Sequence, residues 1–208
     1  RNESVWHLWL DVEVLWGVLK EQPKGSTLRA TLLRRLEEAA DVVDAQGIQE
    51  GADAARAHLA PVIASSAGNS AQIMSAVGHA HIDSAWLWPL RETRRKVART
   101  FSNVLTLAED YPEFTFACTS AQHYAWLKDG APALFARVKE SIAKGQWHPA
   151  GGMWVESDTN LPGGEALVRQ FTVGLNWMER ELGVAPTCTW LPDSFGYTGA
   201  LPQIARLS

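Results

Sequence analysis

After residue 70 the chain alternates between short apolar runs and longer segments with helical periodicity, and this alternation restricts the fold more than any other feature. The apolar runs, which we interpret as strands, are residues 73–77, 113–119, 146–150 and 187–191. Helix-like segments separate or follow them at residues 89–107, 121–144, 164–182 and 200–207. Strands that alternate with helices form a parallel sheet with right-handed crossovers. We therefore expect an α/β fold with parallel strands over residues 71–208.

Residues 1–65 lack this alternation and have the pattern of helices throughout. Apolar residues recur at helical spacing between residues 4 and 20, and Ser26 or Thr27 would cap a second helix. A third helix is expected from residue 48 to residue 59, ending near Pro61. A stretch rich in Ser, Gly and Asn at residues 65–70 has the composition of a linker. We predict a helical region over residues 1–65, separate from the α/β region.

Charge and composition argue against several classes of partner. The chain has 208 residues, a net charge of -4 and no basic run, so nucleic-acid binding is not indicated. It has no apolar run long enough to cross a bilayer and no secretory signal. Cys118 and Cys188 are too few for a disulfide framework, so we expect buried thiols in an intracellular protein. Because Arg1 stands where an initiator Met would be, we also expect the chain to begin inside a longer sequence.

Ionisable residues gather where the first expected strand ends. The segment from Gly78 to Trp86 holds two histidines and an aspartate at alternate positions. Side chains alternate along an extended chain, so His79, His81 and Asp83 would point the same way. Imidazole nitrogen and carboxylate oxygen are ligands that suit zinc and other first-row metals. Burying three such groups unpaired is costly, so the pattern favours metal binding or catalysis over a structural role.

Acidic residues follow two later strands. Chemistry in parallel α/β folds sits at the carboxyl ends of the strands, where Glu156, Asp158 and Asp193 would lie. Asp158 would serve as a third metal ligand, as a nucleophile or as both, and equally as a cap or brace of the turn before Pro162. Glu156, two residues away, is the rival for the first two roles. Asp193 fits an active-site hydrogen-bonding group and a turn carboxylate equally well.

Three segments resemble those of the alpha-mannosidases of glycoside hydrolase family 38. Residues 79–89 resemble the first zinc-binding segment of that family, residues 151–162 its nucleophile segment, and residues 191–197 its Asp-x-Phe-Gly turn. The three occur in family order, and the N-terminal helices resemble the cytosolic and bacterial branch. One departure is that Ser157 and Thr159 flank Asp158, where Pro and Cys would be expected in the closest relatives.

The resemblance implies the first part of a seven-stranded (β/α) barrel over residues 71–208 and a metal cofactor, Zn²⁺ with Co²⁺ as the other candidate. His81 and Asp83 match zinc ligands, and Asp158 matches the residue that is both nucleophile and zinc ligand. Trp86 matches the aromatic residue that stacks under the mannose ring. His79 matches a position beside the ligands, where it would orient the site.

The implied reaction is hydrolysis of terminal alpha-D-mannosidic bonds with retention. The substrate would be a mannose-containing oligosaccharide, with Asp193 among the substrate-binding residues. We expect a cytoplasmic enzyme that binds neither nucleic acid nor membrane, and a homo-oligomer is possible. In the family, a further His ligand and the general acid/base come from later strands. We therefore expect this chain to be a fragment that is inactive alone.

Two other functions are compatible with parts of the pattern. An amidohydrolase-type barrel also has a first strand ending in His-x-His, and it would use His79 and His81 as metal ligands. The segment of residues 151–158 has no role in that scheme. A non-catalytic mannose-binding fragment would instead use the indoles of Trp86, Trp88 and Trp154, and its affinity for mannose would not need a metal.

Overall fold

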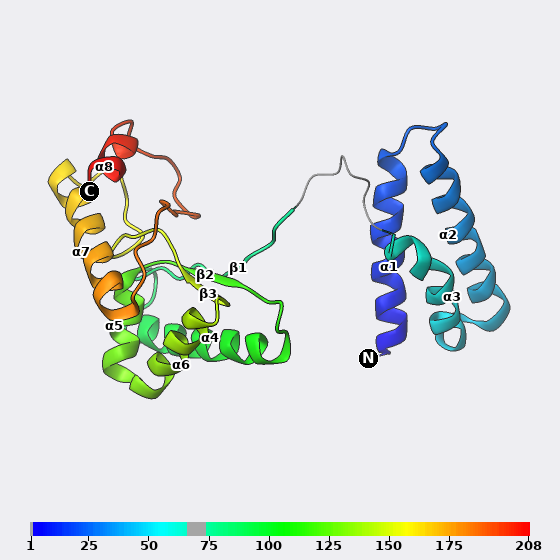
Figure 1. The fold of residues 1–208 in the computed structure, drawn as a ribbon, viewed down its shortest axis with the longest axis horizontal. Coiled ribbons are helices and arrows are strands. Elements are labelled where there is room, and N and C mark those ends of the chain that lie inside the picture. Colours follow the sequence, from blue (N-terminus) through cyan, green and yellow to red (C-terminus); the bar gives the residue numbers. More distant parts are fainter. Residues whose placement is uncertain (1, 66–73) are drawn as a thin grey trace. The chain divides into compact units, whose positions relative to one another are not determined.

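The computed structural model describes residues 2–65 and 74–208, and the chain divides into two compact units, residues 1–73 and 74–208 (Figure 1). The first unit consists, in its described part, of α1 (Glu3–Glu21), α2 (Thr27–Gln46) and α3 (Ile48–Ile63). The second unit holds all the described strands. None of the described helices combines the length and the apolar character that crossing a membrane requires.

The helices of the first unit begin where local capping satisfies their free backbone N–H groups. The side chain of Asn2 accepts a hydrogen bond from the backbone of Val5, and Ser26 accepts one from Arg29. A small apolar core joins the three helices. Its buried members are Leu8, Leu15, Leu19, Leu32, Ala39, Ala52, Ala55 and Leu59. Helix α3 runs past the expected residue 59, includes Pro61 and ends two residues after it, at Ile63.

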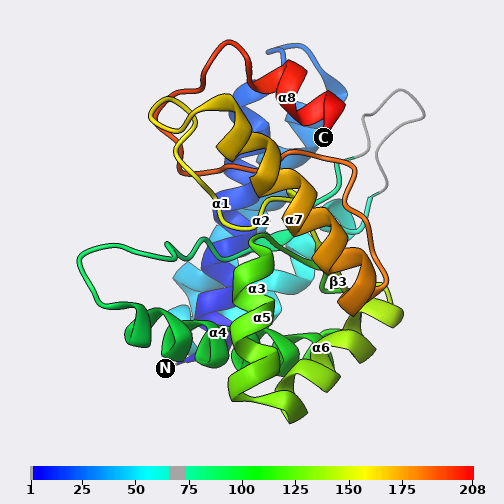
Figure 2. The ribbon, with the colours of Figure 1, turned by 90° about the vertical axis from the view of Figure 1, so that its left-hand side faces the viewer.

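The second unit is built on a three-stranded parallel sheet in the order β1-β2-β3, which confirms the α/β class. The strands are β1 (Gly78–His79), β2 (Phe116–Cys118) and β3 (Trp147–Pro149). The helices are α4 (Leu90–Asp110), α5 (Ala121–Gly130), α6 (Pro132–Ala143), α7 (Gly164–Leu182) and α8 (Leu201–Leu207). Helix α7 contacts both α5 and α8 (Figure 2). The break near Gly130 and the left-handed cap of α7 at Gly183 are as expected.

Two expected strands differ from the structure. The first strand is β1, which begins after the expected range of residues 73–77. Strand β2 begins opposite Gly78, so the residues before Gly78 have no strand to pair with. Residues 71–73 lie outside the described residues, and Met74 is 93% exposed. Residues 187–191 form no strand, since Pro186 and Pro192 at their two ends lack ladder donors. Cys188 is accordingly exposed, and only Cys118 is a buried thiol as expected.

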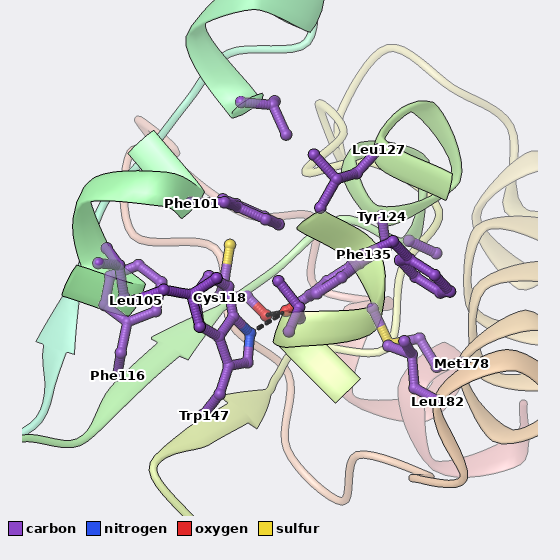
Figure 3. Close-up of a cluster of buried hydrophobic side chains, with 14 residues drawn as sticks. Phe101, Leu105, Phe116, Cys118, Tyr124, Leu127, Phe135, Trp147, Met178 and Leu182 are labelled. Atoms are coloured by element: carbon purple, nitrogen blue, oxygen red, sulfur yellow. Dashed lines mark hydrogen bonds between the residues drawn. The ribbon is translucent and has the colours of Figure 1, made fainter. Parts of the chain in front are cut away.

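An aromatic cluster around Trp147 joins the sheet to its helices (Figure 3). The Trp147 ring lies 4.7 Å from that of Phe101 in α4 and 4.8 Å from that of Phe116 in β2, with edge-on geometry in both pairs. Its indole N–H donates to the Tyr124 hydroxyl, which in turn donates to the carbonyl of Cys118. Every buried polar atom of this chain of contacts therefore has a partner, and the position of β2 is fixed from both sides.

The loop after β3 is fixed against α7 through a glycine contact. A Cβ added at Gly174 would come closer than 3.0 Å to backbone atoms of Gly152, Met153 and Trp154. The same loop donates two backbone hydrogen bonds to Gln170, from Trp154 to its carbonyl and from Val155 to its side chain. The start of the segment that carries Glu156 and Asp158 is thus set by α7.

We predict that Gly174→Ala destabilises the second unit by about 1–3 kcal/mol, because the added methyl group would push against backbone. Urea unfolding followed by circular dichroism would measure this change. The matched control is Gly17→Ala in α1, where a Cβ meets nothing within 4 Å. That change should stabilise the first unit by about 0.5–1 kcal/mol. An equal gain at Gly174 would contradict the close packing described above.

Candidate metal centre

Three ionisable side chains meet at the carboxyl edge of the sheet. His81 and Asp83 follow β1, Asp193 comes from the segment after α7, and their ligand atoms all lie within 4.8 Å of one another. The Nε2 atom of His81 is 3.3 Å from Asp83 Oδ1 and 3.5 Å from Asp193 Oδ2. One imidazole with two carboxylates is a donor set that fits a divalent metal ion.

The other nitrogen of His81 faces a buried carboxylate. Its Nδ1 atom lies 2.8 Å from Glu156 Oε2, although the ring N–H direction does not meet the alignment of a hydrogen bond. The Glu156 side chain is only 10% exposed, and its Oε1 accepts a hydrogen bond from the Thr119 hydroxyl. The backbone N–H of Glu156 donates to the Ser120 hydroxyl over 3.2 Å. Both hydroxyls stand directly after β2, so the end of this strand holds Glu156 against His81.

His79 is anchored to the sheet by one nitrogen. Its Nδ1 lies 2.8 Å from the carbonyl oxygen of Ala117, and because a carbonyl only accepts, this nitrogen carries the hydrogen. The opposite nitrogen, Nε2, is buried without a hydrogen-bond partner among the described residues. Ligand atoms of His79, His81 and Glu156 form a second group within 4.8 Å. His79 therefore lies beside His81 and Glu156 at the same edge.

Asp158 lies outside this cluster. It is exposed, and its Oδ1 accepts backbone hydrogen bonds from Asn160 at 2.7 Å and Leu161 at 2.8 Å. These two bonds hold the pKa of the Asp158 carboxyl below its usual value. The turn-bracing interpretation of Asp158 thus has a structural counterpart, while its catalytic role stays a prediction. Trp86 is 62% exposed at the start of the same edge, which leaves its indole open to a ligand.

A buried histidine, His123, contacts the loop after β1. Nε2 of His123 lies 3.1 Å from the Ser84 hydroxyl, and the Ser84 carbonyl accepts a hydrogen bond from Thr93. Burial, reinforced by the nearby His81, lowers the pKa of His123 to about 4. His123 is therefore neutral at physiological pH and acts as a hydrogen-bonding support for the loop.

Sequence reasoning named Glu156 only as a rival of Asp158 and missed its partners Thr119 and Ser120. The one sequence feature that could have indicated these partners is the pair of hydroxyl residues directly after an apolar strand. No sequence feature indicates the conformation of Ser120, whose φ is 65°, because serine rarely occupies the left-handed region. Such backbone strain in a non-glycine residue is common where a site requires it.

A parallel sheet with an imidazole–carboxylate cluster at its carboxyl edge defines an α/β protein with a candidate metal centre. Residues 71–208 match the family described as glycosyl hydrolases family 38 N-terminal domain, so the chain belongs to this family, as the three segments indicated. The described cluster is formed by residues that lie within this match.

Known proteins of the same kind are much longer. Alpha-mannosidase 2C1 of Mus musculus is 42% identical over 205 residues, which are 99% of this chain and 20% of that protein. Alpha-mannosidase G of Dictyostelium discoideum is 47% identical over 131 residues, 63% of this chain and 12% of that protein. A crystal structure of an alpha-mannosidase from Enterococcus faecalis V583 superposes with a TM-score of 0.57 at 28% identity, covering 63% of this chain and 15% of that one. The chain thus spans a fifth or less of the length of these proteins.

We predict that His123 makes the second unit less stable in acid. Its pKa is about 4 in the folded chain and 6.5 in the unfolded chain, so its contribution is complete above pH 6.5 and is lost as the pH falls toward 4. The loss would amount to about 3 kcal/mol, measured by urea unfolding across this range. His123→Asn should flatten the pH dependence, whereas the same change at the exposed His148 should leave it intact. An unchanged slope in His123→Asn would contradict the prediction.

Proposed function

We propose that this chain carries part of the active site of an alpha-mannosidase that hydrolyses terminal alpha-D-mannosidic bonds with retention. The observation that carries the proposal is the convergence of His81, Asp83 and Asp193 at the carboxyl edge of the sheet. Membership of glycoside hydrolase family 38 supports the same activity and gives no support to an amidohydrolase. The names of the relatives support mannosides as the substrate class.

The donor atoms fit a zinc or cobalt ion. We assign His81, Asp83 and Asp158 as its ligands from this chain, with His79 behind them. Asp158 would join the ligands by giving up its bonds to Asn160 and Leu161. When bound, the metal would supply Lewis-acid binding of sugar hydroxyls.

In the proposed mechanism Asp158 is the nucleophile. Attack requires an ionised carboxylate, and a neighbouring cation would keep Asp158 in this state once its backbone bonds are released. One Asp158 oxygen bonds to the anomeric carbon while the bond to the leaving oxygen breaks, and an acid from the rest of the full-length protein protonates that oxygen. Water then attacks the anomeric carbon from the face that the leaving group had occupied and displaces the Asp158 carboxylate, so two inversions retain the configuration.

Other residues of the edge would bind the sugar. The exposed indole of Trp86 offers an apolar face to the mannose ring. The Asp193 side chain is 56% exposed and would accept hydrogen bonds from sugar hydroxyls. The natural substrate in this proposal is a mannose-containing oligosaccharide.

The rest of the proposal concerns the parent protein. Residues 71–208 would form the first part of a seven-stranded barrel, preceded by a helical region over residues 1–65. The parallel order β1-β2-β3 supports this, since consecutive neighbouring strands are what a (β/α) barrel requires. A cytoplasmic location and a homo-oligomeric state belong to the same proposal.

We predict that Asp158→Asn lowers hydrolysis of 4-nitrophenyl alpha-mannoside by the full-length protein by about a thousandfold or more, since it removes the attacking oxygen. Nuclear magnetic resonance of the wild-type reaction should show the alpha anomer of mannose as first product. Asp129→Asn, on α5 away from the edge, is the matched control and should retain activity. Full activity in Asp158→Asn would remove this residue from the chemistry. Mannose binding without turnover would favour a sugar-binding module.

We further predict that Asp83→Ala removes bound metal from the full-length protein, whereas His79→Ala weakens its binding without abolishing it. The expectation follows from the assignment of Asp83, which faces Nε2 of His81, as a ligand and of His79 as a neighbour of the ligands. Elemental analysis after dialysis against a weak chelator would measure the metal content. The reverse order, with metal lost only from His79→Ala, would favour the amidohydrolase arrangement.

A further inference from the structure

Glu156 is a buried carboxylate at the candidate metal centre that the proposed mechanism does not use. Its side chain is 10% exposed, and no Lys or Arg forms an ion pair with it among the described residues. Its close contacts are Thr119 on one oxygen and His81 on the other. A buried carboxylate without a cationic partner is costly, so its presence at this position points to a specific role.

The contact with His81 bears on which imidazole nitrogen carries the hydrogen once the ring binds a metal ion. In a neutral ring only one nitrogen is protonated, and the other presents a lone pair. In the metal-free chain the ring lies between carboxylates, with Nδ1 2.8 Å from Glu156 and Nε2 within hydrogen-bond distance of Asp83 at 3.3 Å. A cation at Nε2 would take the lone pair of that nitrogen, and the hydrogen would then lie on Nδ1, where the contact with Glu156 is attractive.

Glu156 is itself held in a defined orientation. The Thr119 hydroxyl occupies Oε1, which leaves Oε2 for His81, and the Ser120 hydroxyl accepts the hydrogen of the Glu156 backbone. One residue earlier, Val155 is bonded to Gln170 of α7. The carboxylate is therefore fixed both by the end of β2 and by α7.

We propose that Glu156 is a positioning residue that keeps the hydrogen of His81 on Nδ1 and thereby turns the lone pair of Nε2 toward the metal. This inference rests on the proposed function in assigning His81 as a metal ligand. A carboxylate that receives the second nitrogen of a metal-bound histidine orients the ring and makes it a stronger ligand. The role differs from that of Asp158, because Glu156 touches neither the substrate nor the metal.

The test uses the full-length protein and two readouts. In the zinc-loaded wild type, the Nδ1 proton of His81 should resonate far downfield, as expected for a hydrogen bonded to a carboxylate, and Glu156→Gln should move this resonance upfield. Competition with a chromophoric chelator should show zinc affinity about 10–100-fold lower in Glu156→Gln. Glu156→Asp, which restores the charge, should recover part of the affinity.

The matched control is Glu165→Gln, which removes the same charge from an exposed glutamate of α7 that pairs with Arg169. It should change neither readout. If Glu156→Gln does not fold, Thr119→Val removes the hydroxyl that orients Glu156 and should lower zinc affinity by about 3–10-fold.

Three results would overturn the inference. One is an Nδ1 proton resonance of His81 that Glu156→Gln leaves unmoved, and another is zinc affinity in Glu156→Gln within twofold of the wild type. The third is a second zinc ion per chain that is lost with Glu156, because Glu156 would then be a ligand. These three results leave the proposed function standing. Wild-type protein that neither binds zinc nor hydrolyses mannosides would instead overturn the proposed function together with this inference.

Discussion

The pairing of β1 and β3 on either side of β2 is the constraint on which the rest of the second unit depends. Backbone carbonyls of β2 anchor groups from three directions: Ala117 receives His79, and Cys118 receives both the Tyr124 hydroxyl and the N–H of Ala150. The two residues that follow, Thr119 and Ser120, hold Glu156. The same three-residue strand thus organises the apolar core on one side and the polar edge on the other.

The polar edge has an electrostatic imbalance that the fold alone does not resolve. Asp83, Glu156 and Asp193 all approach the single imidazole of His81. Carboxylates brought together repel one another, and a single imidazole offers at most one positive charge against them. A divalent cation removes this repulsion, so the arrangement favours function at the expense of stability, as active sites commonly do. The aromatic core around Trp147 supplies the rigidity that holds the groups in place.

Features that depend on local chemistry could be predicted from the sequence. The caps Ser26 and Gly183, the break at Gly130 and the closeness of His81 to Asp83 follow from short-range patterns. Asp193 joins them although residues 187–191 form no strand, so the rule that parallel strands end at one edge does not explain its position. The position of β1 depends instead on where β2 begins, which no local pattern specifies. The inward turn of Glu156 depends on Thr119, which is distant in sequence, whereas Asp158 is held by its own turn through Asn160 and Leu161.

Ser120 combines two requirements in one residue. Its φ of 65° suits glycine, yet its hydroxyl accepts the backbone hydrogen of Glu156. A glycine there would relax the backbone but release the carboxylate loop, and a bulkier residue would increase the strain. Optimising this chain for thermal stability and preserving its polar edge are therefore opposing aims at residue 120. Design methods that score backbone conformational energy alone would select glycine at this position, and the hydroxyl that holds Glu156 would be lost.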